Sequence, residues 1–123
     1  MEHIITDHYE WYQNEYASHE EFTSFRNSLG NLLLLDKSTN ASLNDSRYAD
    51  KMDTYGSQKG NVLSAALIPG HYKHNPKFKQ FIEKTGFDFK PYKTFGRDQI
   101  SERAELLGTI VMQLWTPDFE SLD

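Results

Sequence analysis

The stretch GNLLLLDKSTNASLN, residues 30–44, changes character halfway along its length. Its four consecutive leucines, Leu32 to Leu35, form a brief apolar run with clear bounds, which predicts a buried strand rather than a helix. A short helical turn is expected to begin near Asn40. Asn40 and Asn44 are four residues apart, so their side chains would project to the same side of that helix. The stretch therefore predicts a strand followed by a helix with two amides on one face.

The composition indicates a single domain, residues 1–123, that is large enough to bury a modest core. The absence of cysteine excludes a disulfide framework, a thiolate zinc site and a cysteine nucleophile. No apolar run approaches the length of a membrane span, and the first residues lack a basic-then-apolar signal pattern. We therefore expect a cytoplasmic protein that makes no contact with a membrane.

The chain is acidic, with 18 acidic and 13 basic residues and a net charge of -5. Because binding to phosphate requires positive charge, this balance argues against a general nucleic-acid coat protein. It leaves open an enzyme that binds a short stretch of backbone through a few local lysines and arginines.

Helix signals are distributed along most of the chain. Ser18 and Glu21 form a capping box for a helix over residues 18–29, and Gly30 is expected to end it in a left-handed conformation. The remaining helices are expected over residues 47–55, 75–85 and 98–115, with Gly56, Gly86 and Pro117 at their ends. The predicted fold class is α+β, with little strand and several helices.

An acid and a histidine, Glu2 and His3, stand side by side in the opening MEHII. Neighbouring side chains of a strand point to opposite faces. A metal site at a twisted strand end can use both, because the carboxylate binds a hard cation while the imidazole activates a nearby water. Taken alone, the pair is more simply an exposed dipeptide near the terminus.

The asparagines allow two interpretations. Asn31 follows Gly30 and can satisfy backbone groups in a turn, which is a common role of asparagine. Asn40 and Asn44 can converge on an oxygen-preferring metal ion, or they can be a helix cap and a solvated residue.

The order of these features resembles the HNH, or ββα-metal, nuclease motif: an acid-His pair, a Gly-Asn before a second strand, and two later polar residues. More closely, GNLLLLDKSTNASLNDSRYADKMDTY resembles the C-terminal HNH-like domain of GmrSD-type restriction endonucleases. The resemblance continues in the initial EHI and in four residues of the last helix, Ile100, Arg103, Leu107 and Trp115. It implies a ββα-metal (HNH-like) core with a short two-stranded hairpin, embedded in several helices.

The resemblance also implies a role for each matching residue. His3 would be the general base that takes a proton from the attacking water. Asn31 would brace the loop between the two strands and orient His3. Glu2 and Asn40 would hold one divalent metal ion, Mg²⁺ or Mn²⁺, and Asn44 would be a further ligand or would support one.

Several cations are candidates for binding DNA phosphate. By resemblance, Lys51 would neutralise phosphate charge at the catalytic site, and Arg103 would either contact DNA or form a salt bridge. The one clearly basic stretch, HYKHNPKFK at residues 71–79, contains Lys73 and Lys77. It is either an edge that binds the DNA backbone or a solvated helix start. His71 and His74 in the same stretch are expected to be surface residues rather than a zinc site.

The implied function is metal-dependent hydrolysis of DNA phosphodiester bonds, in restriction and anti-phage defence. GmrSD-type proteins carry an N-terminal nucleotide-dependent domain, so we expect this chain to be the C-terminal part of a longer protein. The family usually continues its histidine motif with a proline, whereas this chain reads HIITDHYEWY. The alternatives are a catalytically degenerate HNH-fold module that binds DNA or protein, or a metal-free fragment that pairs with another domain.

Overall fold

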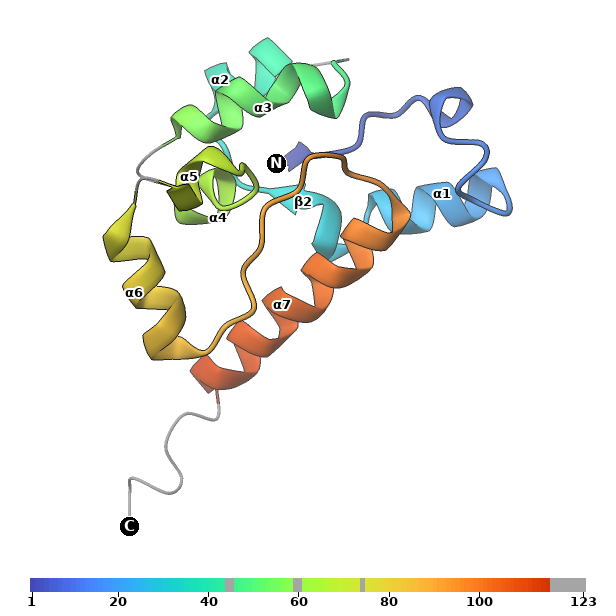
Figure 1. Ribbon diagram of the computed structural model, residues 1–123. Helices are drawn as coiled ribbons and strands as arrows, with labels where there is room; N and C mark the ends of the chain where they lie inside the picture. The colour runs from blue at the N-terminus through green and yellow to red at the C-terminus, as the bar shows by residue number, and fades with distance from the viewer. Residues whose placement is uncertain (44–45, 59–60, 74, 116–123) are drawn as a thin grey trace.

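The computed structural model of the chain describes residues 1–43, 46–58, 61–73 and 75–115, and most of these residues are helical (Figure 1). Two strands, β1 (Glu2–His3) and β2 (Leu32–Leu33), pair antiparallel, with Glu2 opposite Leu33 and His3 opposite Leu32. The helices of the described residues are η1 (Tyr9–Trp11), α1 (His19–Arg26), η2 (Leu29–Asn31), α2 (Lys37–Leu43), α3 (Tyr48–Ser57), α4 (Val62–Ala65), α5 (Gly70–Lys73), α6 (Pro76–Thr85) and α7 (Arg97–Trp115). The predicted helix-rich α+β fold with a short two-stranded hairpin is confirmed.

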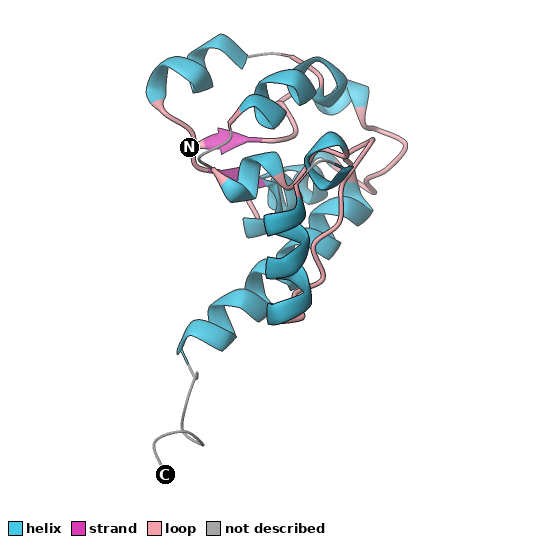
Figure 2. Ribbon diagram, turned by 60° about the vertical axis from the view of Figure 1, so that its left-hand side comes forward, coloured by secondary structure: helices cyan, strands magenta, loops and turns pink. Residues whose placement is uncertain are grey.

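The strand pair lies between two groups of helices. In Figure 1, α2 and α3 lie on one side of the strands, and α7 crosses on the other side, where it packs against η2. Figure 2 shows the same order from a second direction. The largest apolar side chains that are fully buried in the core are those of Ile4, Ile5, Phe22, Tyr55, Leu67 and Ile100. Among the described helices, none is long and apolar enough to cross a membrane.

Two of the predicted helix ends agree closely with the structure. The hydroxyl of Ser18 accepts a hydrogen bond from the backbone N–H of Glu21 at 3.1 Å, which confirms the cap of α1. Gly86 ends α6 in a left-handed conformation with φ 73°, as its position after Thr85 predicts.

Two other ends differ from the prediction. Helix α1 ends at Arg26 rather than at residue 29, and Leu29 instead begins the separate 3-10 helix η2. Helix α3 continues through Gly56 to Ser57, so Gly56 does not end it. Asn44, His74, Pro117 and the side chains of Leu114 and Trp115 lie outside the described part of the chain.

Gly30 lies in η2 and is not left-handed, so the prediction of a glycine cap is wrong. Its role is close packing instead. A Cβ atom built on Gly30 would clash with the carbonyl oxygen of Ile100 on α7 and would lie 3.0 Å from the backbone nitrogen of Ala104. Only a residue without a side chain lets η2 approach the backbone of α7 this closely.

Arg103 joins α7 to the same segment by hydrogen bonds. Its Nη1 donates to the carbonyl oxygens of Gly30 at 3.0 Å and Leu32 at 2.8 Å. The side chain is 3% exposed, and this burial lowers the pKa of Arg103 to about 10. A salt bridge was one predicted role, yet the partners of Arg103 among the described residues are backbone carbonyls. The second predicted role of Arg103 was a contact with DNA, and the burial of its side chain gives no support to that role.

Replacing Gly30 by alanine is expected to destabilise the fold by about 2 kcal/mol or more, because the new methyl group overpacks a backbone contact. Gly108 on α7 is the matched control, since no atom lies near a Cβ built there. Gly108→Ala is expected to be neutral or to stabilise by up to about 1 kcal/mol through helix propensity. Chemical denaturation of both variants measures the difference, and equal stabilities would contradict the packing role of Gly30.

Candidate functional site

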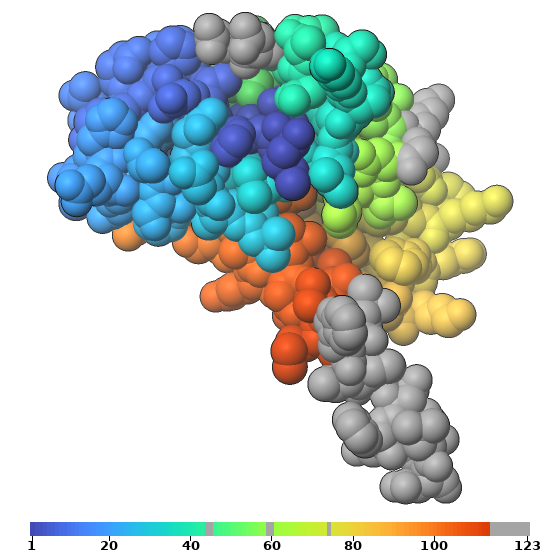
Figure 3. All heavy atoms as spheres, turned by 180° about the vertical axis from the view of Figure 1, so that it is seen from behind, coloured from blue at the N-terminus to red at the C-terminus, as the bar shows by residue number. Residues whose placement is uncertain are grey.

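A hollow of about 250 Å³ opens beside β1, and we call it the β1 hollow. It is lined by Met1, Glu2, His3, Thr6, Asp7, Arg26, Asn40 and Ala41. Three predicted site residues, Glu2, His3 and Asn40, therefore meet at one place although 37 positions separate His3 from Asn40. Figure 3 shows this face, with the first residues in dark blue between α1 in light blue and α2 in blue-green.

Asn31 fixes the backbone that follows His3. It is completely buried, and its Oδ1 accepts a hydrogen bond from the backbone N–H of Ile5 at 2.8 Å. Its Nδ2 donates to the carbonyl of Arg26 at 2.8 Å, and its own carbonyl accepts from the N–H of Ile4 at 2.8 Å. One side chain thus ties the end of α1 to the segment after β1. Whether these bonds serve to orient His3 for catalysis stays a prediction.

Glu2 points partly into the protein, where two donors hold one of its carboxylate oxygens. Tyr55 donates its hydroxyl to Oε2 at 2.8 Å, and the Nζ of Lys51 lies 3.3 Å from the same atom. Burial, and secondly the charge of Glu2, raises the pKa of Tyr55, so its hydroxyl stays protonated as a donor. The other oxygen, Oε1, makes no hydrogen bond within the described residues. Glu2 therefore lines the β1 hollow with a carboxylate that is largely buried and bound on one oxygen.

Lys51 has a different position from the one expected of a phosphate-binding lysine. It is completely buried, and its Nζ donates to the carbonyls of His3 at 3.0 Å and Ile4 at 3.2 Å. Together with the ion pair to Glu2, these bonds attach β1 to α3. The structure supports a positioning role for Lys51, and its burial gives no support to contact with DNA.

His3 is half-buried at the edge of the β1 hollow. Its Nε2 lies 3.2 Å from Oδ1 of Asn27, and in the tautomer that donates this hydrogen bond Nδ1 has a lone pair. Burial, and secondly the positive charge of Arg26, lowers the pKa of His3. The imidazole is therefore neutral at pH 7 and can accept a proton.

Asn40 contributes an amide from α2. Asp36 positions this helix, because its Oδ1 accepts from the backbone N–H of Thr39 at 2.8 Å. The Nδ2 of Asn40 is 3.4 Å from the carbonyl of Met1, while its Oδ1 makes no hydrogen bond within the described residues. Asn40 thus lines the same hollow as Glu2, with an amide oxygen that has no hydrogen-bond partner in the described part of the chain.

The donor set suits a hard cation in part. The oxygens of Glu2 and Asn40 are of the kind that Mg²⁺ and Mn²⁺ prefer, and Asp7 lines the same hollow. Against this, no group of three or more His, Cys, Asp or Glu in the described ranges could hold a metal ion. The ammonium of Lys51 also reduces the negative charge at Glu2. A cation held by Glu2 and Asn40 would therefore have to take the rest of its shell from water and phosphate oxygens.

Four contributors were not predicted from the sequence: Asp7, Arg26, Asn27 and Tyr55. Asp7 precedes His8, and this second acid-His pair was the only feature of the sequence that could have indicated Asp7 as a site residue. Arg26 and Asn27 lie at the end of α1, and only the packing of that helix against β1 brings them to His3.

Lys73 and Lys77 lie away from the β1 hollow. Lys73 ends α5, and Lys77 lines a separate hollow of about 330 Å³ with Phe78 and Phe81 of α6. In Figure 3, α6 (yellow) is at the opposite edge of the molecule from α1. A phosphate contact by these lysines stays a prediction, and it would involve a part of DNA distant from the cleaved bond.

Lys51→Met is expected to reduce stability by about 3–5 kcal/mol, because it leaves a buried carboxylate without its cation. The double variant Glu2→Gln with Lys51→Met is expected to recover part of this loss. Lys90→Met is the matched control, since Lys90 and Glu102 form an ion pair with both side chains nearly half exposed. Its expected effect is about 1 kcal/mol or less. Urea denaturation measures all three, and similar losses for the two single variants would contradict the structural role of Lys51.

Comparison with known proteins identifies the family. Residues 1–110 match the family model of the C-terminal domain of GmrSD restriction endonucleases. No curated protein and no solved structure matches the chain. The match covers most of the chain, including the β1 hollow and the first part of α7. The chain therefore belongs to the family of GmrSD restriction endonuclease C-terminal domains.

Proposed function

We propose that this domain is a metal-dependent DNA endonuclease of the HNH type. The observation that carries the proposal is the β1 hollow, where Glu2, His3 and Asn40 converge. Glu2 and His3 come from β1, and Asn40 comes from α2, the helix that follows the paired strand β2. We take this strand pair and helix as the ββα-metal core. Family membership supports an activity related to restriction endonucleases.

His3 is the general base of the proposed reaction. Its Nδ1 takes a proton from a water molecule whose oxygen attacks the phosphorus, and the bond to the leaving 3′ oxygen breaks with its electron pair. The lowered pKa keeps the imidazole neutral before the reaction. Asn27 orients the ring, and Asn31 holds the backbone on its C-terminal side.

Arg26 supplies positive charge beside the base. It lines the β1 hollow, and its Nε is buried without a hydrogen-bond partner in the described part of the chain. A guanidinium can bind a phosphate oxygen through its remaining N–H groups. When bound by Glu2 and Asn40, Mg²⁺ or Mn²⁺ would act as a Lewis acid on the phosphate and the leaving oxygen.

In this proposal DNA is the substrate and the cytoplasm is the site of action. The domain would work as the C-terminal part of a longer protein, in which an N-terminal nucleotide-dependent domain selects the DNA. Restriction of foreign DNA is the resulting biological role.

His3→Ala is expected to reduce cleavage of supercoiled plasmid in Mg²⁺ or Mn²⁺ by about 10²–10⁴-fold, because the general base is lost. His19→Ala on α1 is the matched control, because His19 is exposed and lies outside the β1 hollow. Its cleavage rate is expected to equal that of the wild type. Equal rates for wild type and His3→Ala would remove His3 from the mechanism.

A second candidate is a catalytically degenerate module that binds DNA or protein. It is favoured by the ammonium of Lys51, which lies 3.3 Å from the carboxylate that would bind the metal. Calorimetric titration with Mn²⁺ separates the two. The endonuclease requires binding that Asn40→Ala weakens, whereas a folded domain that binds no Mn²⁺ favours the module.

The pH dependence of cleavage offers an independent test of His3. Because its pKa lies below the ordinary value of about 6.5, activity is expected to persist below pH 6.5 and to fall as His3 becomes protonated. Arg26→Gln removes one cause of the lowered pKa and should move this acid limb to higher pH. Arg47→Gln, which changes an exposed arginine outside the hollow, should leave the limb in place. If Arg26→Gln leaves the acid limb of the pH–activity profile at the same pH, the proposed effect of Arg26 on the pKa of His3 is contradicted.

A further inference from the structure

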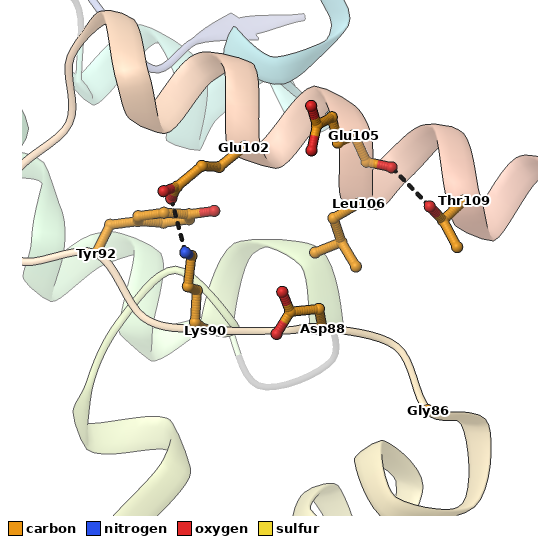
Figure 4. A pocket seen from close by; sticks show the side chains of 8 residues that line it. All are labelled: Gly86, Asp88, Lys90, Tyr92, Glu102, Glu105, Leu106 and Thr109. Carbon is orange, nitrogen blue, oxygen red and sulfur yellow. Dashed lines mark hydrogen bonds and ion pairs between the residues drawn. The ribbon is translucent and has the colours of Figure 1, made fainter.

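A larger hollow, of about 390 Å³, lies between residues 86–92 and α7, and we call it the acidic hollow (Figure 4). It shares no residue with the β1 hollow. Its lining residues are Gly86, Asp88, Lys90, Tyr92, Glu102, Glu105, Leu106 and Thr109. The proposed cleavage reaction uses none of these residues.

Negative charge exceeds positive charge in this hollow. The one lysine, Lys90, already pairs with Glu102, with 3.0 Å between Nζ and Oε2. Asp88 and Glu105 make no ion pair within the described residues. Because the side chains of Lys90 and Glu102 are nearly half exposed, their pair is weak and can be shared with another cation.

Tyr92 provides an independent feature of the acidic hollow. Its side chain is only 7% exposed, and its backbone is fixed by hydrogen bonds with Leu67 and Tyr48. The phenol hydroxyl makes no hydrogen bond within the described part of the chain, and in Figure 4 it points into the space between α7 and the segment that contains Asp88. Although most of the Tyr92 side chain is buried, the hydroxyl is open to the hollow that it lines. It can therefore form a hydrogen bond with a partner from outside the chain.

The hydroxyl retains its proton at neutral pH. Burial, and secondly the charge of Glu102, raises the pKa of Tyr92 to about 12. A neutral phenol keeps lone pairs that accept a hydrogen bond from an N–H donor. The acidic hollow thus combines a neutral phenol acceptor with carboxylates.

We propose that the acidic hollow binds an organic cation, a guanidinium or an alkylammonium group, through Asp88, Glu105 and the Tyr92 hydroxyl. A bare metal ion fits less well, because in the described ranges no three acidic or imidazole side chains could hold one. A guanidinium spreads its charge and presents several N–H donors, which suits acceptors that lie apart. Leu106 supplies an apolar wall for the aliphatic stem of such a group.

This cation can come from two sources: an arginine side chain of a protein segment, or a free polyamine. N-acetyl-arginine amide and spermidine are the two probes. N-acetyl-citrulline amide is the uncharged control, because it has nearly the shape of the arginine probe. Titrations followed by calorimetry and by backbone amide NMR measure the affinity of each probe and the residues it affects.

The arginine probe or spermidine is expected to bind at least tenfold more tightly than the citrulline control. The amide shifts should be confined to residues 86–92 and 102–109. The tighter of the two cations identifies the source. If neither cation binds more tightly than the citrulline control, the proposal is overturned.

Variants locate the site and separate it from the cleavage reaction. Asp88→Asn and Tyr92→Phe are each expected to weaken binding about fivefold or more. Tyr92→Phe should leave the melting temperature unchanged, because its hydroxyl has no partner in the described chain. Glu83→Gln on α6 is the matched control, since Glu83 is exposed and lies outside the acidic hollow. Unchanged affinity in Tyr92→Phe and Asp88→Asn would refute the site, whether or not the domain cleaves DNA.

Discussion

The fold depends on the satisfaction of backbone polar groups around a strand pair that has only two residues on each side. Strands this short form few hydrogen bonds with each other, yet buried N–H and C=O groups need partners. Three buried polar side chains supply them. Asn31 binds the backbone after β1, Lys51 binds the carbonyls of His3 and Ile4, and Arg103 binds the carbonyls of η2 and β2. Side chains from η2, α3 and α7 thus supply backbone hydrogen bonds that the additional residues of a longer sheet would otherwise form.

Three residues of the family motif have a structural role because of this constraint. Asn31, Lys51 and Arg103 match the family pattern, but the structure places all three inside the protein. Their shared effect is to position Glu2 and His3 at the edge of the β1 hollow. A short β1 can carry site residues because donors and acceptors reach it from three directions. The family pattern therefore combines residues that line a site with residues that support the backbone beneath it.

The two hollows differ in electrostatic character. The β1 hollow contains Arg26 and a neutral imidazole, and Lys51 offsets the charge of Glu2 from inside. The acidic hollow contains two carboxylates without ion pairs in the described chain, Asp88 and Glu105, so it repels phosphate. The two proposals thus assign opposite ligand charges to two separate places on a chain with a net charge of -5.

The sequence by itself determined the α+β class and the caps at Ser18 and Gly86, because capping and periodicity act over a few residues. The pairing of Glu2–His3 with the start of the leucine run joins distant parts of the chain, and it was expected only from the family resemblance. Only the tertiary structure decided the roles of Gly30, Lys51 and Arg103. Each depends on which distant backbone lies beside it: a glycine that the sequence presents as a cap is required by a helix about 70 residues later. Likewise, Arg26 and Tyr92 carry no local signal. Their importance comes from burial and from charges that folding brings close, which no spacing along the chain encodes.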